Sequence, residues 1–217
     1  MEDQPETPRA DHRFSETLRR IEQRVSDGPL TLGEMLELAG SQGHAFLAIF
    51  LVLPFLQPIP LPGISSAVGA VLAVLGLFVA LQRPPWLPRR FAALPLDRDT
   101  VIRISAVLER LLRSVEHVVR PRAASLFARR WFRAWNGTLW VVHAIVFSLP
   151  LPIPLSNAFP AVVILLLALG TVEEDLGVIV LGWVGAVANV LFFGGLLGGL
   201  VGGLRGLPAA LGALGGL

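Results

Sequence analysis

Long uncharged tracts alternate with polar segments along the 217-residue chain. Residues 44–82 and 134–172 each contain 39 consecutive positions without Asp, Glu, Lys or Arg, and residues 176–204 contain 29 more. A helix that crosses a bilayer needs about 20 predominantly apolar residues. The pattern therefore predicts an all-α integral membrane protein whose three apolar tracts lie in the membrane.

Prolines interrupt the first two tracts. Proline removes a backbone donor and clashes with the preceding helical turn, so each tract is expected to form two helices around a non-helical break. In the first tract the earlier helix covers 44–56, which is about 20 Å at 1.5 Å per residue. That is shorter than the hydrocarbon core of roughly 30 Å, whereas the later helix, 63–82, is long enough to cross it.

A four-residue motif repeats in these two breaks. Residues 58–61 and 152–155 both read PIPL, at an offset of 94. Paired proline-interrupted hydrophobic segments are typical of internally duplicated membrane folds. We therefore expect two related proline-interrupted helical hairpins, followed by a Gly-rich C-terminal transmembrane helix.

The depth of the breaks in the membrane has two interpretations. Backbone groups that the prolines leave unpaired cannot face lipid. Breaks at mid-depth would make the hairpins re-entrant, as in an inverted repeat, whereas breaks at the interface would make plain hairpins with Pro-rich turns. The first interpretation predicts a polar binding site formed by Gln57, Pro58, Pro60, Pro62, Gly63, Pro152, Pro154, Asn157 and Pro160.

Polar segments flank the apolar tracts. Residues 1–43 begin with a polar tail and continue with two short amphipathic surface helices, the second opened by the capping-box residues Thr31 and Glu34. Residues 83–133 hold twelve Arg and four acidic residues, so the positive-inside rule places them in the cytoplasm. The chain thus divides into 1–43, 44–82, 83–133, 134–175 and 176–217.

Charge suggests two further sites. Arginines beside the apolar tracts can bind phosphate or lipid head groups, and the candidates are Arg120, Arg122, Arg129 and Arg130. Glu173, Glu174 and Asp175 form either a solvated turn or a proton or ion site, since ionisable groups near membrane depth are usually functional.

Composition narrows the chemistry. The chain has no cysteine, and none of its four histidines are paired at the i,i+4 spacing of a metal site. We expect no metal, no cofactor and no nucleic-acid partner. Because the sequence contains no recognisable catalytic set, we expect a protein that is not an enzyme.

Small residues line the last tract. Gly194, Gly195, Gly198, Gly199 and Gly202 allow helix backbones to approach closely. This face is expected to pack within the chain or to form a homodimer, and both alternatives stay open. Asn189 in the same tract is expected to bond a neighbouring helix.

Several motifs follow one another in order over about residues 14–195, namely TLGEMLELAGSQG, LPFLQPIPLPGIS, PPWLP, EHVVRPR and SLPLPIPLSNAFPAVVILLLALGTVEED. In this order and spacing they resemble the ExoD family of bacterial exopolysaccharide-synthesis membrane proteins. The turn after the second tract departs from the family pattern, because Leu176-Gly177 follows Glu174-Asp175. The resemblance implies a multi-pass protein of the bacterial inner membrane with lipids and polysaccharide-assembly proteins as partners.

Two functions are compatible with these features. The first is a non-enzymatic component of exopolysaccharide synthesis or export that handles a lipid-linked or anionic substrate at the polar site between the breaks. The alternative is a small ion-coupled secondary transporter or channel that affects the cell envelope indirectly. Neutralising the charges of Glu173, Glu174 and Asp175 distinguishes them, because only the alternative predicts a loss of coupled flux.

Cysteine labelling tests the hydrated site, since the natural chain has no competing thiol. Single cysteines introduced at positions 57–62 and 151–157 are expected to react with a membrane-impermeant maleimide, because broken backbone at membrane depth must face protein or water. Cysteines at lipid-facing positions of the flanking helices serve as controls and should not react. Equal protection of both sets would contradict the hydrated site.

Overall fold

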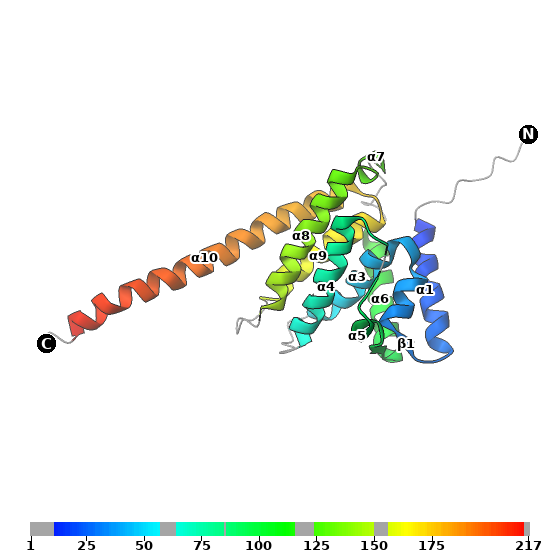
Figure 1. Cartoon of the computed structure of the whole chain (residues 1–217), viewed down its shortest axis with the longest axis horizontal. Coiled ribbons are helices and arrows are strands. Elements are labelled where there is room, and N and C mark those ends of the chain that lie inside the picture. Colours follow the sequence, from blue (N-terminus) through cyan, green and yellow to red (C-terminus); the bar gives the residue numbers. More distant parts are fainter. Residues whose placement is uncertain (1–10, 57–63, 85, 116–123, 150–155, 215–217) are drawn as a thin grey trace, which may run out of the picture.

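The computed structural model describes residues 11–56, 64–84, 86–115, 124–149 and 156–214. These residues are almost entirely helical (Figure 1). In chain order the elements are α1 (Asp11–Ser26), β1 (Leu30–Thr31), α2 (Leu32–Leu38), the 3-10 helix η1 (Gly40–Gln42), α3 (Gly43–Val52), the 3-10 helix η2 (Leu53–Leu56), α4 (Ile64–Leu81), α5 (Arg89–Ala92), β2 (Pro95–Leu96), α6 (Arg98–Val115), α7 (Ala124–Phe127), α8 (Arg130–Ser148), α9 (Ala158–Val172) and α10 (Leu176–Leu214).

The proline-interrupted tracts form the helices that the sequence predicts. In the first tract α3 and η2 precede the break and α4 follows it, and in the second tract α8 precedes the break and α9 follows it. Helix α4 and residues Leu176–Gly199 of α10 are long and apolar enough to cross a membrane, whereas Gly40–Leu56 and Ala158–Val172 are shorter apolar helices. The protein is therefore mostly helical with two candidate membrane-spanning helices.

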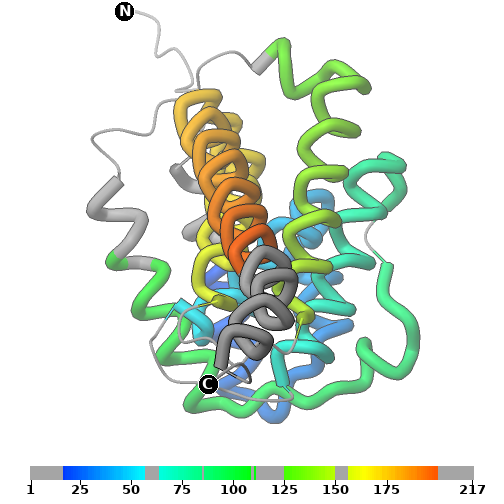
Figure 2. Tube along the Cα trace, turned by 90° about the vertical axis from the view of Figure 1, so that its left-hand side faces the viewer, coloured from blue at the N-terminus to red at the C-terminus, as the bar shows by residue number. Residues whose placement is uncertain are grey.

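Helices α4 and α8 form the most extensive contact between two elements (Figure 2). They run antiparallel, because Gly69 of α4 contacts Ser148 at the end of α8, whereas Gly137 near the start of α8 contacts Ala80. Midway, Gly76 lies against the Trp140 ring. Absent side chains at these three glycines let the two backbones approach closely, as small residues do in membrane helix pairs.

A second contact between the two tracts joins α3 with α9. Helix α3 is buried from Gly43 to Phe50, and α9 buries most of its residues. Each pair thus combines the first helix of one tract with the second helix of the other, which is the contact pattern that a two-fold relation between the tracts would produce. The duplication itself stays a prediction.

The breaks at 57–63 and 150–155, and with them most of the predicted polar site, lie outside the described residues. The helix ends that flank them meet at one end of the bundle, where Ser66 Oγ donates a hydrogen bond of 2.9 Å to the Ser148 carbonyl oxygen. Both breaks therefore adjoin the same end of the α4–α8 pair, since the first break precedes α4 and the second follows α8. Their depth in a membrane stays a prediction.

The N-terminal and central segments pack together beside the bundle (Figure 1). Helix α1 contacts α6, and their buried apolar side chains belong to the same core as α3 and α9, namely Leu18, Ile21, Val25, Val101, Ile104 and Leu108. The all-α prediction is wrong at one place, where β1 and β2 form a short antiparallel pair. Leu30 pairs with Leu96, and Thr31 pairs with Pro95. Two residues are too few to carry an alternating pattern, so only the packing of α1 and α2 against the central segment creates this pair.

A capping box opens α2, as predicted. Thr31 Oγ1 accepts a 3.3 Å bond from the Glu34 backbone N–H, and Glu34 Oε2 accepts a 2.9 Å bond from the Thr31 N–H. Arg24 adds an ion pair of 2.8 Å to the same carboxylate. The Thr31 N–H and, next, the Arg24 guanidinium hold the pKa of Glu34 below its usual range. The box therefore also ties α1 to α2.

The corner between α9 and α10 is a Schellman motif. Glu174 has a positive φ of 50°, and the N–H of Asp175 donates a 3.1 Å bond to the Gly170 carbonyl. This bond satisfies a carbonyl that the end of a helix leaves unpaired. Glycine usually occupies the left-handed position, so Glu174 holds a conformation that costs about 1 kcal/mol for a residue with a Cβ.

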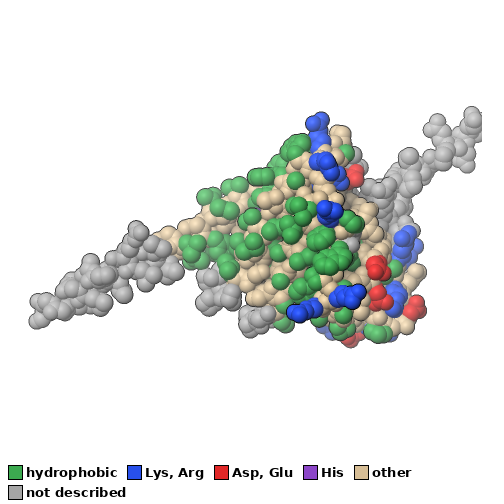
Figure 3. Space-filling view, viewed as in Figure 1, with side chains coloured by type: hydrophobic (Ala, Val, Ile, Leu, Met, Phe, Trp, Pro, Cys, Tyr) green, Lys and Arg blue, Asp and Glu red, His purple; other side chains and the backbone are tan. Residues whose placement is uncertain are grey.

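Charge is distributed unevenly over the surface (Figure 3). Exposed apolar side chains cover α4, α8 and α10, and include Leu77, Ile145, Leu181, Val184, Val187 and Leu191. The arginine and acidic side chains visible in Figure 3 gather at the border of this apolar face and on the side of α1. This segregation is what a bilayer on the apolar side requires.

Gly137→Ala tests the close packing of α4 and α8. Its Cβ would overlap the backbone of Ala80, so overpacking should lower the free energy of unfolding by about 1–3 kcal/mol. The matched control is Gly194→Ala, whose Cβ meets nothing within 4 Å. The control should be neutral or stabilising because alanine favours helix. Thermal unfolding of the full chain in detergent measures both, and equal midpoints would contradict the packing.

Glu174→Gly tests the corner. Glycine adopts a positive φ without a Cβ penalty, so the variant should be more stable by about 1 kcal/mol. The control Glu22→Gly places the same substitution inside α1, where it should destabilise by about the same amount. Opposite shifts of the unfolding midpoint are expected. A destabilised Glu174→Gly variant would show that the Glu174 side chain matters more than its backbone.

Candidate functional site

The most distinctive polar arrangement lies where the end of α4 meets the start of α8. Gln82 follows α4 with a positive φ of 55°, and a second Schellman motif closes the helix. The N–H of Gln82 bonds the Val79 carbonyl at 3.1 Å, and that of Arg83 bonds the Phe78 carbonyl at 2.9 Å. The turn directs the chain away from α4 and leaves the Gln82 side chain against α8.

The Gln82 amide organises two arginines. Its Nε2 donates a 2.7 Å bond to the Arg130 carbonyl, and its Oε1 accepts bonds from Arg130 Nε at 3.2 Å and from Arg133 Nη2 at 3.4 Å. One neutral oxygen therefore holds two guanidinium groups close together. We call Gln82, Arg129, Arg130 and Arg133 the arginine cluster.

The arginine cluster carries uncompensated positive charge. Arg129, Arg130 and Arg133 are exposed, and in the part of the chain that the structure describes none of them pairs with a carboxylate. Neighbouring like charges raise the local positive potential, which attracts anions. The planar guanidinium presents several N–H donors that match phosphate oxygens. The cluster is therefore suited to binding a phosphate group.

Exposed tryptophans accompany the arginines. Trp131 and Trp135 lie on the same helix, and Trp86 follows α4; all three are more than half exposed. Tryptophan is enriched where membrane meets water, because its ring is apolar and its N–H is polar. The tryptophans and the arginine cluster thus lie beside the exposed apolar side chains of α4 and α8.

The sequence identified only part of this cluster. Arg129 and Arg130 belong to it, whereas the other two predicted phosphate ligands, Arg120 and Arg122, lie outside the described residues. Arg133 and Gln82 are absent from the predicted phosphate ligands. Helical spacing from Arg130 was the available signal for Arg133, because residues three apart share a helix face. Gln82 had no local signal, since its role depends on a contact with a residue 48 positions away.

The predicted ion or proton site is the corner before α10. Glu173 and Asp175 are buried, and Asp175 Oδ1 accepts a 2.6 Å bond from the Gly177 N–H. Asp175 thus caps α10, a role that Asp175→Asn would retain, because the amide oxygen of asparagine also accepts a hydrogen bond from a backbone N–H. Among the described residues no group of three His, Cys, Asp or Glu is arranged to hold a metal. A proton or ion at this corner stays a prediction.

Two predicted members of the polar site between the breaks are described. Asn157 is the residue before α9, and its side chain makes no capping hydrogen bond. Pro160 is buried in the first turn of α9, where its missing N–H sacrifices no helical hydrogen bond. Pro160 therefore has a structural reason to be there, whatever the remaining seven residues of the site do.

Polar side chains are buried between α8 and α10. Asn136 donates a 2.8 Å bond to the Phe132 carbonyl, and its Oδ1 accepts a 2.9 Å bond from Trp183 Nε1. Further along, His143 shares a 2.7 Å bond with the Leu139 carbonyl through Nδ1. Nε2 of His143 and Nδ2 of Asn189 are buried without a hydrogen-bond partner, so the expected bond from Asn189 to another helix is not made by its amide nitrogen.

The glycine-rich face of α10 is open. A Cβ at Gly194, Gly195, Gly198 or Gly199 would meet nothing within 4 Å. None of these four glycines therefore packs against the part of the chain that the structure describes, because α10 projects beyond the other described helices (Figure 1). Pairing with a second copy stays a prediction, and nothing is described of side chains from residue 200 onward, including Gly202.

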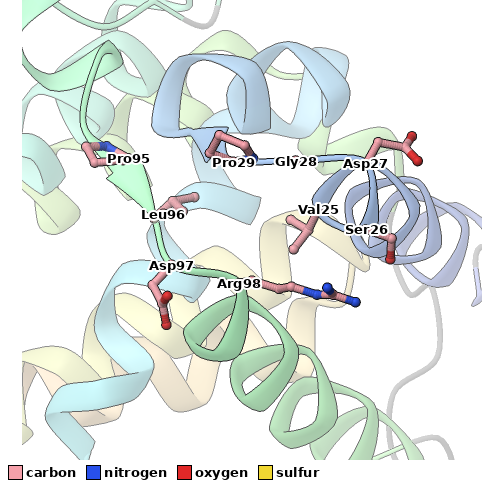
Figure 4. Close-up of a pocket in the computed structure, with 9 residues that line it drawn as sticks. All are labelled: Val25, Ser26, Asp27, Gly28, Pro29, Pro95, Leu96, Asp97 and Arg98. Carbon is pink, nitrogen blue, oxygen red and sulfur yellow. The ribbon is translucent and has the colours of Figure 1, made fainter.

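A pocket of about 610 Å³ lies between the end of α1 and the start of α6 (Figure 4). Val25 and Leu96 point into it, whereas Asp27 points away. Asp97 Oδ2 accepts a 3.2 Å bond from the Thr100 N–H and so caps α6. Because this carboxylate is already engaged, the pocket offers apolar surface rather than acid–base chemistry.

Comparisons with known proteins agree on one family. Residues 14–195 match the family model described as "Exopolysaccharide synthesis, ExoD". Protein ExoD of Rhizobium meliloti is 31% identical over 181 residues, covering 83% of this chain and 75% of the relative. Uncharacterized protein slr1875 of Synechocystis is 25% identical over 165 residues, covering 75% of this chain and 77% of the relative. No solved structure matches. The chain belongs to the ExoD family of exopolysaccharide-synthesis proteins.

Proposed function

We propose that this protein is a non-enzymatic, multi-pass component of the bacterial inner membrane that assists exopolysaccharide synthesis or export. At the arginine cluster it binds the phosphate of an anionic lipid or of a lipid-linked sugar. Membership of the ExoD family supports a role in exopolysaccharide synthesis. The binding chemistry rests on the residues of the cluster.

One observation carries the proposal: Arg130 and Arg133 converge on the neutral oxygen of Gln82 at 3.2 and 3.4 Å. A carboxylate in that place would cancel one of the two positive charges. The amide instead orders both guanidinium groups and leaves their charge available to a ligand, which reduces the side-chain entropy that binding has to remove. The remaining donors of each guanidinium can bind phosphate oxygens.

The surface supports a position at the head-group level. Apolar side chains cover α4, α8 and α10, and arginines lie at the border of this apolar face (Figure 3). The tryptophans at 86, 131 and 135 are exposed. Arginine-rich segments next to membrane helices stay on the cytoplasmic side. We therefore place the arginine cluster and residues 83–133 in the cytoplasm, facing the inner leaflet.

Support for a non-enzymatic role comes from the tasks that ionisable side chains already perform. Asp97 and Asp175 cap helices, and Glu34 completes a capping box and pairs with Arg24. General acid–base catalysis needs groups within hydrogen-bond reach of a reacting atom. These carboxylates instead accept hydrogen bonds from backbone N–H groups.

The arrangement of the two tracts supports a site between the proline breaks. Helix pairs α3–α9 and α4–α8 cross between the tracts, and α4 and α9 both end in a Schellman motif with a non-glycine residue at positive φ, Gln82 and Glu174. In this proposal the duplicated hairpins frame a polar site at one end of the bundle. The arginine cluster lies at the opposite end of the bundle. There it binds the substrate or contacts the partner polysaccharide-assembly proteins.

Replacing both clustered arginines tests the proposal. The double variant Arg130→Gln/Arg133→Gln should bind phosphatidylglycerol and polyprenyl phosphate about thirtyfold more weakly, since each arginine near a lipid surface contributes about 1 kcal/mol and about 1.4 kcal/mol is a factor of ten. Affinities are measured on the full chain in a zwitterionic detergent. The control Arg98→Gln/Arg103→Gln removes two exposed arginines of α6 and should retain full affinity. Exopolysaccharide yield in cells that depend on the variant provides the second readout.

Two results would contradict the proposal. Equal phosphate-lipid affinity of the wild type and the Arg130/Arg133 variant would remove the cluster as the binding site. An equal loss in the Arg98/Arg103 control would show that total charge, rather than the ordered pair on Gln82, determines binding.

A further inference from the structure

A second pocket, of about 350 Å³, lies between α2 and the segment 86–92. Glu37 and Trp86 line it together with apolar Leu36, Leu87 and Ala92. Gly40, which has φ 57°, also lines the pocket. A Cβ added at Gly40 would meet no described atom within 4 Å, so this edge of the pocket is open. The pocket is separate from the arginine cluster, because it shares no residue with it.

The indole of Trp86 is held in a fixed orientation. Its ring stacks on Phe78 of α4, with centroids 5.5 Å apart and planes 26° from parallel, while 52% of the residue stays exposed. Stacking on one face and exposure of the rest leave a preorganised aromatic surface in the pocket wall. The face of an indole carries negative electrostatic potential, which attracts cations more strongly than other aromatic rings do.

Glu37 supplies a negative charge to the same pocket. It is exposed and makes no hydrogen bond or ion pair with any described side chain. The other side chains of the lining are apolar. A carboxylate, an indole and an apolar wall together match an alkyl ammonium group, whose charge meets Glu37 and whose carbon atoms meet Trp86 and Leu87. A sugar ring would need several polar side chains, and this pocket provides one.

We propose that this pocket binds the ammonium group of a phospholipid head group, ethanolamine or choline. Arg89 and Arg90 are exposed on α5, the helix whose Ala92 lines the pocket. Their charge disfavours a free organic cation but suits the phosphate that adjoins the ammonium in a zwitterionic lipid. The exposed indole is also typical of residues at the membrane interface.

Lipid binding by the full chain in detergent tests the pocket. The wild type should bind short-chain phosphatidylethanolamine, and Glu37→Gln and Trp86→Leu should each weaken that binding about three- to tenfold, the loss of one exposed charge or cation–π contact. Binding of phosphatidylglycerol, which has no ammonium, should stay unchanged. Glu22→Gln and Trp135→Leu are matched controls away from the pocket and should bind like the wild type. Glu37 is exposed, so Glu37→Gln should keep the unfolding temperature of the wild type. Trp86→Leu loses the stacking on Phe78, so its affinity is measured at a temperature at which circular dichroism shows the variant to be folded.

Three outcomes would overturn the proposal. Unchanged phosphatidylethanolamine affinity in both pocket variants would exclude this pocket. Equal losses for phosphatidylethanolamine and phosphatidylglycerol would exclude ammonium recognition. Binding of free ethanolamine or tetramethylammonium as tight as that of the lipid would show that the ligand is a soluble amine. A failure of the proposed function at the arginine cluster gives a different result. In that case phosphatidylglycerol binding does not depend on Arg130 and Arg133.

Discussion

The backbone contact between α4 and α8 organises this protein. Gly69, Gly76 and Gly137 bring the two helices together along their whole length. In an apolar surrounding the hydrophobic effect cannot drive helices together, so close van der Waals packing has to do so. The contact brings the end of α4 next to the start of α8, and the Ser66–Ser148 bond fastens the other end. Both the arginine cluster and the ends of the proline breaks are therefore positioned by the same helix pair.

The two ends of that pair have different character. One end adjoins the two proline breaks, and at the other end α4 and α9 stop in Schellman motifs at Gln82 and Glu174. Each motif uses an ordinary residue where glycine is favoured. At Gln82 the strained backbone places an amide between two arginines, which is consistent with the tendency of backbone strain to occur at functional sites. At Glu174 the motif leads directly into the capping residue of α10.

The sequence predicted the elements better than their contacts. The capping box at Thr31, the short helix α3 and the long helix α4 follow from local patterns, because caps, prolines and apolar runs act within a few residues. The strand pair between Leu30 and Leu96 did not, since its partners are 66 positions apart and each strand has two residues. The site residues divide in the same way: Arg129 and Arg130 are visible as charge beside an apolar tract, whereas Gln82 is not.

Composition and periodicity determined that this chain is helical, largely apolar and charged at the borders of its apolar tracts, because those properties depend on each residue and its near neighbours. The tertiary structure decided which helices pair and that Glu37 and Trp86 share a pocket. It decided as well that four glycines of α10 meet no described residue, namely Gly194, Gly195, Gly198 and Gly199. It also decided that a neutral amide holds Arg130 and Arg133 together. Such contacts join residues that lie tens of positions apart, and no local pattern encodes the distance between them.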